Sequence, residues 1–157
     1  MTFARAPLPP PDPLDGVAEM LDRTATAALA QTFHGLSPAT MMQSFSDWAM
    51  HLALAPGKQM QLAAKAGRKY ARLCDYALRS ASDPSAPLAI DPLPQDHRFD
   101  DPAWNQPPFN LMAQAFLLNQ QWWHAATTGV AGVSRHHQDV VQFTARQLLD
   151  VLAPTNS

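Results

Sequence analysis

The residues best suited to chemistry in this sequence lie in one nine-residue stretch, from Asp96 to Trp104. Arg98 stands between Asp96 and Asp100, close enough for a bidentate ion pair once the loop folds back. Phe99 and Trp104 can each bury a large area with few rotatable bonds. The stretch therefore predicts a rigid, ion-paired loop that inserts two aromatic rings into a groove. It does not resemble a set of catalytic groups.

Other candidate reactive residues are weaker. The single cysteine, Cys74, lacks the flanking glycines that a nucleophile elbow requires. Among arginines its thiol could be somewhat nucleophilic, but a buried packing role is the preferred interpretation. His136 and His137 are adjacent and would point about 100° apart on a helix, so they do not converge on one metal. We therefore predict no catalytic residue, no metal and no cofactor.

Two residue pairs have both a structural and a functional interpretation. Asp47 and His51 are four positions apart and could pair across one helical turn, for which a hydrogen bond is favoured over proton transfer. Trp122 and Trp123 could form a stacking platform for a ligand, but a place in the core or at an interface is favoured.

Composition argues against several classes of protein. A chain of 157 residues can bury a core, and a formal charge of −2 argues against a general nucleic-acid binder. One cysteine fits a reducing compartment. The first residues lack the apolar region of a signal peptide, and no apolar run reaches the length that spans a bilayer. We expect a cytoplasmic protein.

Apolar periodicity predicts an all-α fold of about five helices and no strand. Residues 1–13 hold five prolines and predict a disordered arm, with a proline-recognition ligand as the alternative. We expect a three-helix unit over 14–80, a proline-rich linker over 81–108, and an antiparallel helix pair over 109–157. Within the linker, Ser82 to Pro94 is expected to be loose and Asp96 to Trp104 ordered. The five helices are expected from Leu14 to Phe33, from Pro38 to just before Pro56, from Pro56 to about Ser80, from Pro108 to about Thr127, and from Ser134 to Pro154.

The third of these helices has two distinct faces. Small and apolar residues form one face, which should allow close approach of a neighbouring helix: Met60, Ala63, Ala64, Gly67, Tyr70, Ala71, Cys74, Ala77 and Leu78. Most of the chain's basic residues form the other: Lys58, Lys65, Arg68, Lys69, Arg72 and Arg79. The basic face predicts an anionic partner, such as coenzyme A phosphates, a lipid- or polymer-covered surface, or DNA. The favoured interpretation is nevertheless a solvated face balanced by acids elsewhere, and DNA is disfavoured.

The nine-residue stretch resembles the Asp-x-Arg-Phe-x-Asp-Pro-x-Trp motif of the N-terminal region of polyhydroxyalkanoate synthases, also called poly-β-hydroxybutyrate polymerases. Other segments match this family in order: Gly35 to Pro38, Asp47-Trp48, His51-Leu52, Pro56 to Gln59, Leu117 to Asn119, Phe143, Gln147 to Asp150 and Ala153 to Asn156. One departure is His97, where the family more often has a second arginine.

The resemblance implies a non-catalytic region. In the family, an α/β-hydrolase domain with a Gly-x-Cys-x-Gly turn follows and polymerises 3-hydroxyacyl units from coenzyme A thioesters. None of its catalytic residues can be carried onto this sequence. The implied roles are subunit association, stability of the catalytic domain and placement at the polyester granule. The alternative is a free-standing, phasin-like protein that binds a granule or lipid surface.

We expect the contacts with a catalytic domain or a second subunit to come from the motif and the broad apolar face of the following helix. The residues assigned to this interaction are Asp96, Arg98, Phe99, Asp101, Trp104, Phe116, Trp122 and Trp123.

Overall fold

A computed structural model describes residues 16–24 and 36–156 of the chain. The predicted arm at 1–13 and much of the first predicted helix lie outside the described residues, although 16–24 are helical. The chain divides into two compact units, Met1–Met41 and Met42–Ser157. The sites discussed below all lie in the second unit.

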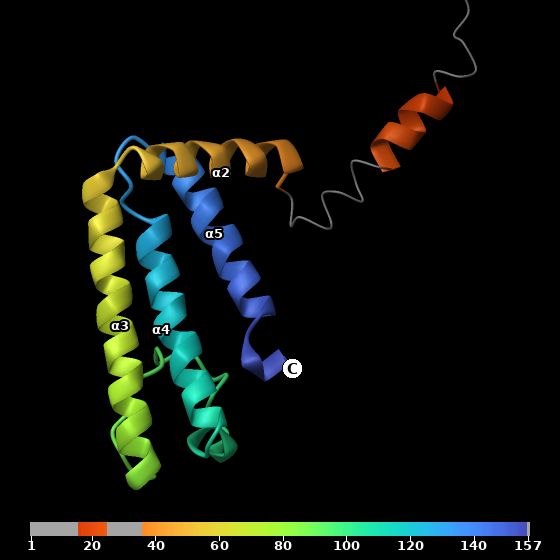
Figure 1. Ribbon diagram of the computed structural model, residues 1–157. Helices are drawn as coiled ribbons and strands as arrows, with labels where there is room; N and C mark the ends of the chain where they lie inside the picture. Colours follow the sequence, from red (N-terminus) through yellow and green to blue (C-terminus); the bar gives the residue numbers. More distant parts are fainter. Residues whose placement is uncertain (1–15, 25–35, 157) are drawn as a thin grey trace, which may run out of the picture. The chain divides into compact units, whose positions relative to one another are not determined.

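The described part of the chain is helical and contains no strand, which confirms the all-α prediction with about five helices (Figure 1). Proline or a capping side chain marks most helix starts. Ser37 caps α2, with its Oγ accepting from the Thr40 backbone N–H at 3.0 Å, and Ser134 caps α5 in the same way through His137. The bounds are α2 Pro38–Ala53, α3 Pro56–Ser82, η1 Pro102–Asn105, α4 Phe109–Thr127, α5 Arg135–Val151 and η2 Pro154–Asn156.

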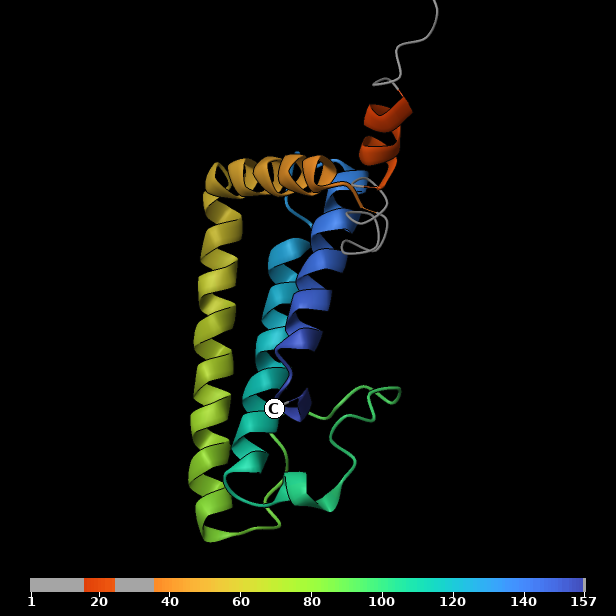
Figure 2. The same cartoon turned by 90° about the vertical axis from the view of Figure 1, so that its right-hand side faces the viewer.

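Helix α4 occupies the centre of the second unit, with α3 packed on one side and α5 on the other (Figures 1 and 2). The three helices run antiparallel to their neighbours. This explains the broad apolar face expected for α4, because a helix with two neighbours must bury two sides. The buried apolar residues of these helices are Leu62 and Tyr76 of α3, Ala113, Phe116, Leu117, Leu118 and Ala126 of α4, and Val140, Val141 and Ala145 of α5.

Helix α3 does not bury the face that the sequence suggested. Met60, Tyr70 and Leu78 of the expected apolar stripe are 73%, 71% and 75% exposed, and α3 instead buries Leu62 and Tyr76 toward its neighbours. The stripe as a packing face within this chain was therefore a wrong prediction. Basic residues can line the inner face because their aliphatic stems cover apolar surface while their charged ends reach polar acceptors.

The linker between α3 and α4 is anchored along its first half, where a loose segment was expected. Ala89 is buried with Tyr76 and Leu118. Its carbonyl accepts from Arg72 Nη2 at 2.6 Å, and the Ile90 N–H donates to Gln114 Oε1 at 2.8 Å. The proposed division into units at this linker stays a prediction. Helices α3 and α4 pack together across the linker.

None of the helices in the described ranges combines the length and apolar content that crossing a membrane requires.

Candidate functional site

Arg98 is the centre of an ion-pair network that joins the linker to α4 and α5. Its Nε and Nη2 donate to the two carboxylate oxygens of Asp96, both at 2.7 Å, as the sequence predicted. The second partner is not Asp100, which pairs with His97 at 2.8 Å. It is Asp150 of α5, whose Oδ1 accepts from Arg98 Nη1 at 2.9 Å. The sequence pattern did not reveal this contact.

The network is half-buried, and it shifts the pKa values of Asp96 and Arg98. The hydrogen bond from Arg98 lowers the pKa of Asp96 below its ordinary value of 3.8. The same hydrogen bond raises the pKa of Arg98, so both groups stay charged at neutral pH. The guanidinium also lies over the ring of Phe116, with 5.0 Å from Cζ to the ring centroid, a cation–π contact.

The aromatic residues of the motif pack on α4 of the same chain. Phe99 lies edge-to-face on Trp104, with ring centroids 5.1 Å apart, and 5.9 Å from Phe116. Trp104 contacts Phe109 at 5.8 Å, and Asp101 begins the short helix η1 by accepting from the Ala103 N–H at 2.8 Å. The aromatic partners of these rings are thus supplied by α4 of the same chain.

Trp122 lies at the α3–α4 contact, whereas Trp123 lines a pocket with residues of α5 and of the linker. The rings of Trp122 and Trp123 are edge-to-face at 5.4 Å, and both residues are half-buried. Trp122 Nε1 donates to the Leu62 carbonyl at 3.0 Å, which fixes α4 against α3. Of the eight residues assigned to a partner interface, all but the exposed Asp101 are at least half-buried here. Their contact with a partner stays a prediction.

A second cluster joins α2 to α5. The expected pair forms, with His51 Nδ1 3.0 Å from Asp47 Oδ1. Asp47 Oδ2 also lies 2.6 Å from His137 Nδ1, a contact across 90 positions that no local pattern could indicate. The hydrogen bond with His137 is the main reason that the pKa of Asp47 is lowered. These contacts give the Asp47 carboxylate and the Nδ1 atom of each histidine a structural role.

The six basic residues of α3 do not form one exposed surface. Lys69 Nζ donates to Gln121 Oε1 at 2.6 Å and Lys58 Nζ donates to the Thr128 carbonyl at 2.7 Å, so both reach toward the α4 side. Arg79 pairs with Asp75 at 2.9 Å. Lys65 and Arg68 line a cleft between α3 and α4.

Among the described residues no group of three or more histidine, cysteine or acidic side chains could hold a metal ion. Cys74 is half-buried in the middle of α3. Its hydrogen bond with Tyr70 is the main reason that the pKa of Tyr70 is raised. A position inside a helix lacks the strand-to-helix turn of a nucleophile elbow.

Two segments of the chain match models of known protein families. Residues 16–58 match the family described as Poly-beta-hydroxybutyrate polymerase N terminal. Residues 95–157 match the family described as Poly-beta-hydroxybutyrate polymerase (PhaC) N-terminus. The second match contains the whole Arg98 network. The two segments cover about two thirds of the chain, which therefore belongs to the family of poly-β-hydroxybutyrate polymerase N-terminal regions.

One curated relative is a poly(3-hydroxyalkanoate) polymerase from Methylorubrum extorquens, 29% identical over 102 residues. The match covers 64% of this chain but 17% of the relative, so the chain corresponds to a small part of that polymerase. No solved structure matches the chain.

Proposed function

We propose that this chain is a non-catalytic docking region of a polyhydroxyalkanoate polymerase, which binds the catalytic part of the enzyme and supports its stability. The observation that carries the proposal is the outer face of α3, defined by exposed residues at helical three- and four-residue steps: Met60, Ala63, Gly67, Tyr70, Ala71 and Leu78. An apolar row of this kind favours a protein partner over solvent.

The outer face has the spacing and side-chain sizes of a helix-packing seam. Its members recur at the spacing of a coiled-coil seam, and three of them are alanine or glycine, so a partner helix can approach closely. Nothing lies within 4 Å of the position that a Cβ on Gly67 would occupy. The helix has 27 residues, about 40 Å of length at 1.5 Å per residue.

The proposed occupant is the catalytic remainder of the polymerase. This choice is supported by the curated relative, in which the matched segment is 17% of a much longer protein. The aromatic motif then has a supporting role: it braces α4, which in turn holds α3. Placement of the polymerase at the polyester granule is a further part of the proposal and follows from the family resemblance.

The test is association of this chain with a separately produced catalytic part, measured by light scattering and titration. Gly67→Glu places a charge in the outer face without meeting another side chain, and should weaken association by at least about tenfold. Ala66→Glu is the matched control, since Ala66 is exposed on α3 beside the outer face. Equal binding by both variants would remove the docking surface from α3.

A second measurement separates the alternative role. The purified chain is mixed with native polyester granules and centrifuged. Strong partition in the absence of the catalytic part, lost in Gly67→Glu but not in Ala66→Glu, would support the granule-binding alternative over docking. Consumption of acyl-coenzyme A by the chain alone would contradict a non-catalytic region.

A further inference from the structure

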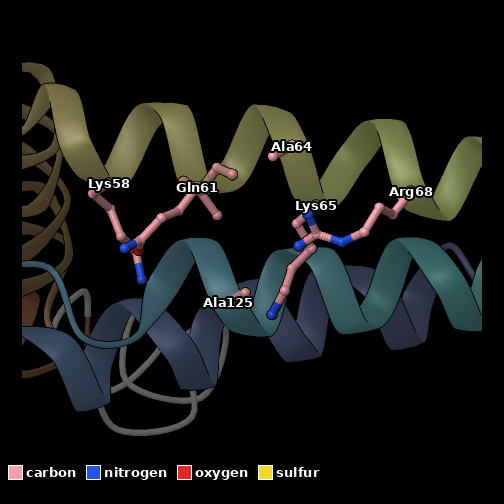
Figure 3. A pocket seen from close by; sticks show the side chains of 7 residues that line it. Lys58, Gln61, Ala64, Lys65, Arg68 and Ala125 are labelled. Carbon is pink, nitrogen blue, oxygen red and sulfur yellow. The ribbon is translucent and has the colours of Figure 1, made fainter.

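A cleft of about 330 Å³ lies between α3 and α4, on the inner side of α3. Figure 3 shows side chains reaching from α3 into it over Ala125 of α4. Its chemically distinctive lining is Lys58, Gln61, Lys65 and Arg68, with the buried Leu62 beneath them.

The charge in this cleft is of one sign. Three of its lining residues are cations and none is an acid. Helix α4 contains no aspartate or glutamate, and the single acid of α3, Asp75, pairs with Arg79. Within the described part of the chain, no carboxylate is found in an ion pair with Lys58, Lys65 or Arg68.

The like charges act on each other. Lys69, next to the cleft, has a lowered pKa, first because burial disfavours its charge and then because Lys65, Arg72 and Arg68 repel it. Such an arrangement costs folding free energy unless an anion compensates it, and binding sites are often maintained at such a cost.

We propose that this cleft binds a soluble small molecule that carries two or more linked phosphate groups, through Lys58, Lys65 and Arg68. Lys58 is fixed by its bond to the Thr128 carbonyl, which leaves its other N–H groups to donate. Arg68 offers the planar fork that binds phosphate oxygens in pairs, and Gln61 adds an uncharged donor.

The spacing selects an elongated anion. Lys58 and Arg68 are ten residues apart, about 15 Å along the helix. Linked phosphates can contact more of these three cations at once than a single phosphate can. A lipid surface fits less well, because Lys58 and Lys65 are half-buried beside α4 and a flat layer of headgroups cannot enter the cleft.

This site is independent of the proposed docking, since it uses the inner side of α3 and not its outer face. The experiment titrates the chain with inorganic triphosphate by calorimetry at low salt. Wild type and Arg146→Gln, an exposed arginine on α5, should bind equally. The double variant Lys65→Gln, Arg68→Gln should lose at least about tenfold in affinity, because two charge-assisted contacts are removed.

Two further measurements, of thermal stability and of vesicle binding, test the same proposal. Triphosphate should raise the thermal midpoint of wild type and Arg146→Gln but not of the double variant, and circular dichroism checks that the double variant is folded. Vesicles containing phosphatidylglycerol form the second arm. Binding to vesicles without binding to triphosphate would overturn the proposal, as would equal triphosphate affinity in the double variant and the control. Retained triphosphate binding in Gly67→Glu would show that docking and anion binding are separate properties.

Discussion

Arg98 and Asp150 lie 52 positions apart and join the linker to α5 through a 2.9 Å ion pair. Because Arg98 also holds Asp96 with two hydrogen bonds and Gln120 with a third, one guanidinium connects the linker and two helices. Its planar, five-donor geometry suits this role, and lysine could not reproduce it.

Replacing Arg98 with methionine should destabilise the chain. The change leaves Asp96, whose side chain is 11% exposed, without its cation. We expect a loss of about 1–3 kcal/mol in the free energy of unfolding, the cost of an unpaired, largely buried charged acceptor. Urea unfolding followed by circular dichroism measures it, with Arg146→Met as the control. A loss no larger than that of the control would mean that the network contributes little.

The same network predicts a pH dependence. Arg98 lowers the pKa of Asp96 below 3.8, so the folded state binds this proton less tightly than the unfolded state does. The stabilisation is complete above pH 3.8 and is lost as the pH falls through the lowered folded pKa. Unfolding measured between pH 6 and pH 2 should therefore show a steeper acid loss in wild type than in Asp96→Asn. Parallel curves would count against this account.

Gly132 should not tolerate a side chain. It has φ +91°, and an added Cβ would overlap the ring of His51, which is held by Asp47. Gly132→Ala should cost about 1–3 kcal/mol of stability through backbone strain and overpacking. Gly67→Ala is the matched control: it lies inside α3 with open space around it and should gain about 0.5–1 kcal/mol. Thermal unfolding of both variants gives the comparison, and a neutral Gly132→Ala would contradict the described turn.

Asp47 should hold α2 against α5. Its contact to His137 depends on its carboxylate, whereas His51 Nδ1 also lies 2.8 Å from the Asp47 backbone carbonyl within α2. Asp47→Asn should therefore weaken the attachment of α2 to α5. Amide hydrogen exchange of α2 should become faster, while exchange in the central part of α4 changes little. Asp139→Asn, at an exposed position on α5, is the control. Unchanged exchange in α2 would show that Trp48, which donates to the Ala126 carbonyl at 2.9 Å, is sufficient to hold it.

The sequence predicted the features that local chemistry determines. Proline and serine caps predicted the helix starts, and the spacing of Asp96 and Arg98 predicted their bidentate pair. The sequence did not predict contacts between distant segments, because the apolar period of one helix does not indicate which other helix packs against it. Asp150 and His137 gave no signal of their partners.

The main prediction of this kind that proved wrong was which face of α3 packs against the rest of the chain. An amphipathic helix with an apolar row and a basic row is normally placed with the apolar row inward. Here α4 presents amide and carbonyl acceptors such as Gln121 and Thr128 toward α3, and these favour lysine at the contact. Acceptors supplied by another helix are not visible in the sequence of α3.

The reversed orientation of α3 has a consequence for mutational tolerance. In a saturation scan scored only by expression of the isolated chain, the row containing Met60, Gly67 and Leu78 should accept almost any residue except proline. The inward-facing positions of α3, such as Lys58 and Lys69, should tolerate fewer substitutions. A scan scored by activity of the assembled polymerase should reverse this ranking. The positions on which the two scans disagree would then outline the proposed docking surface.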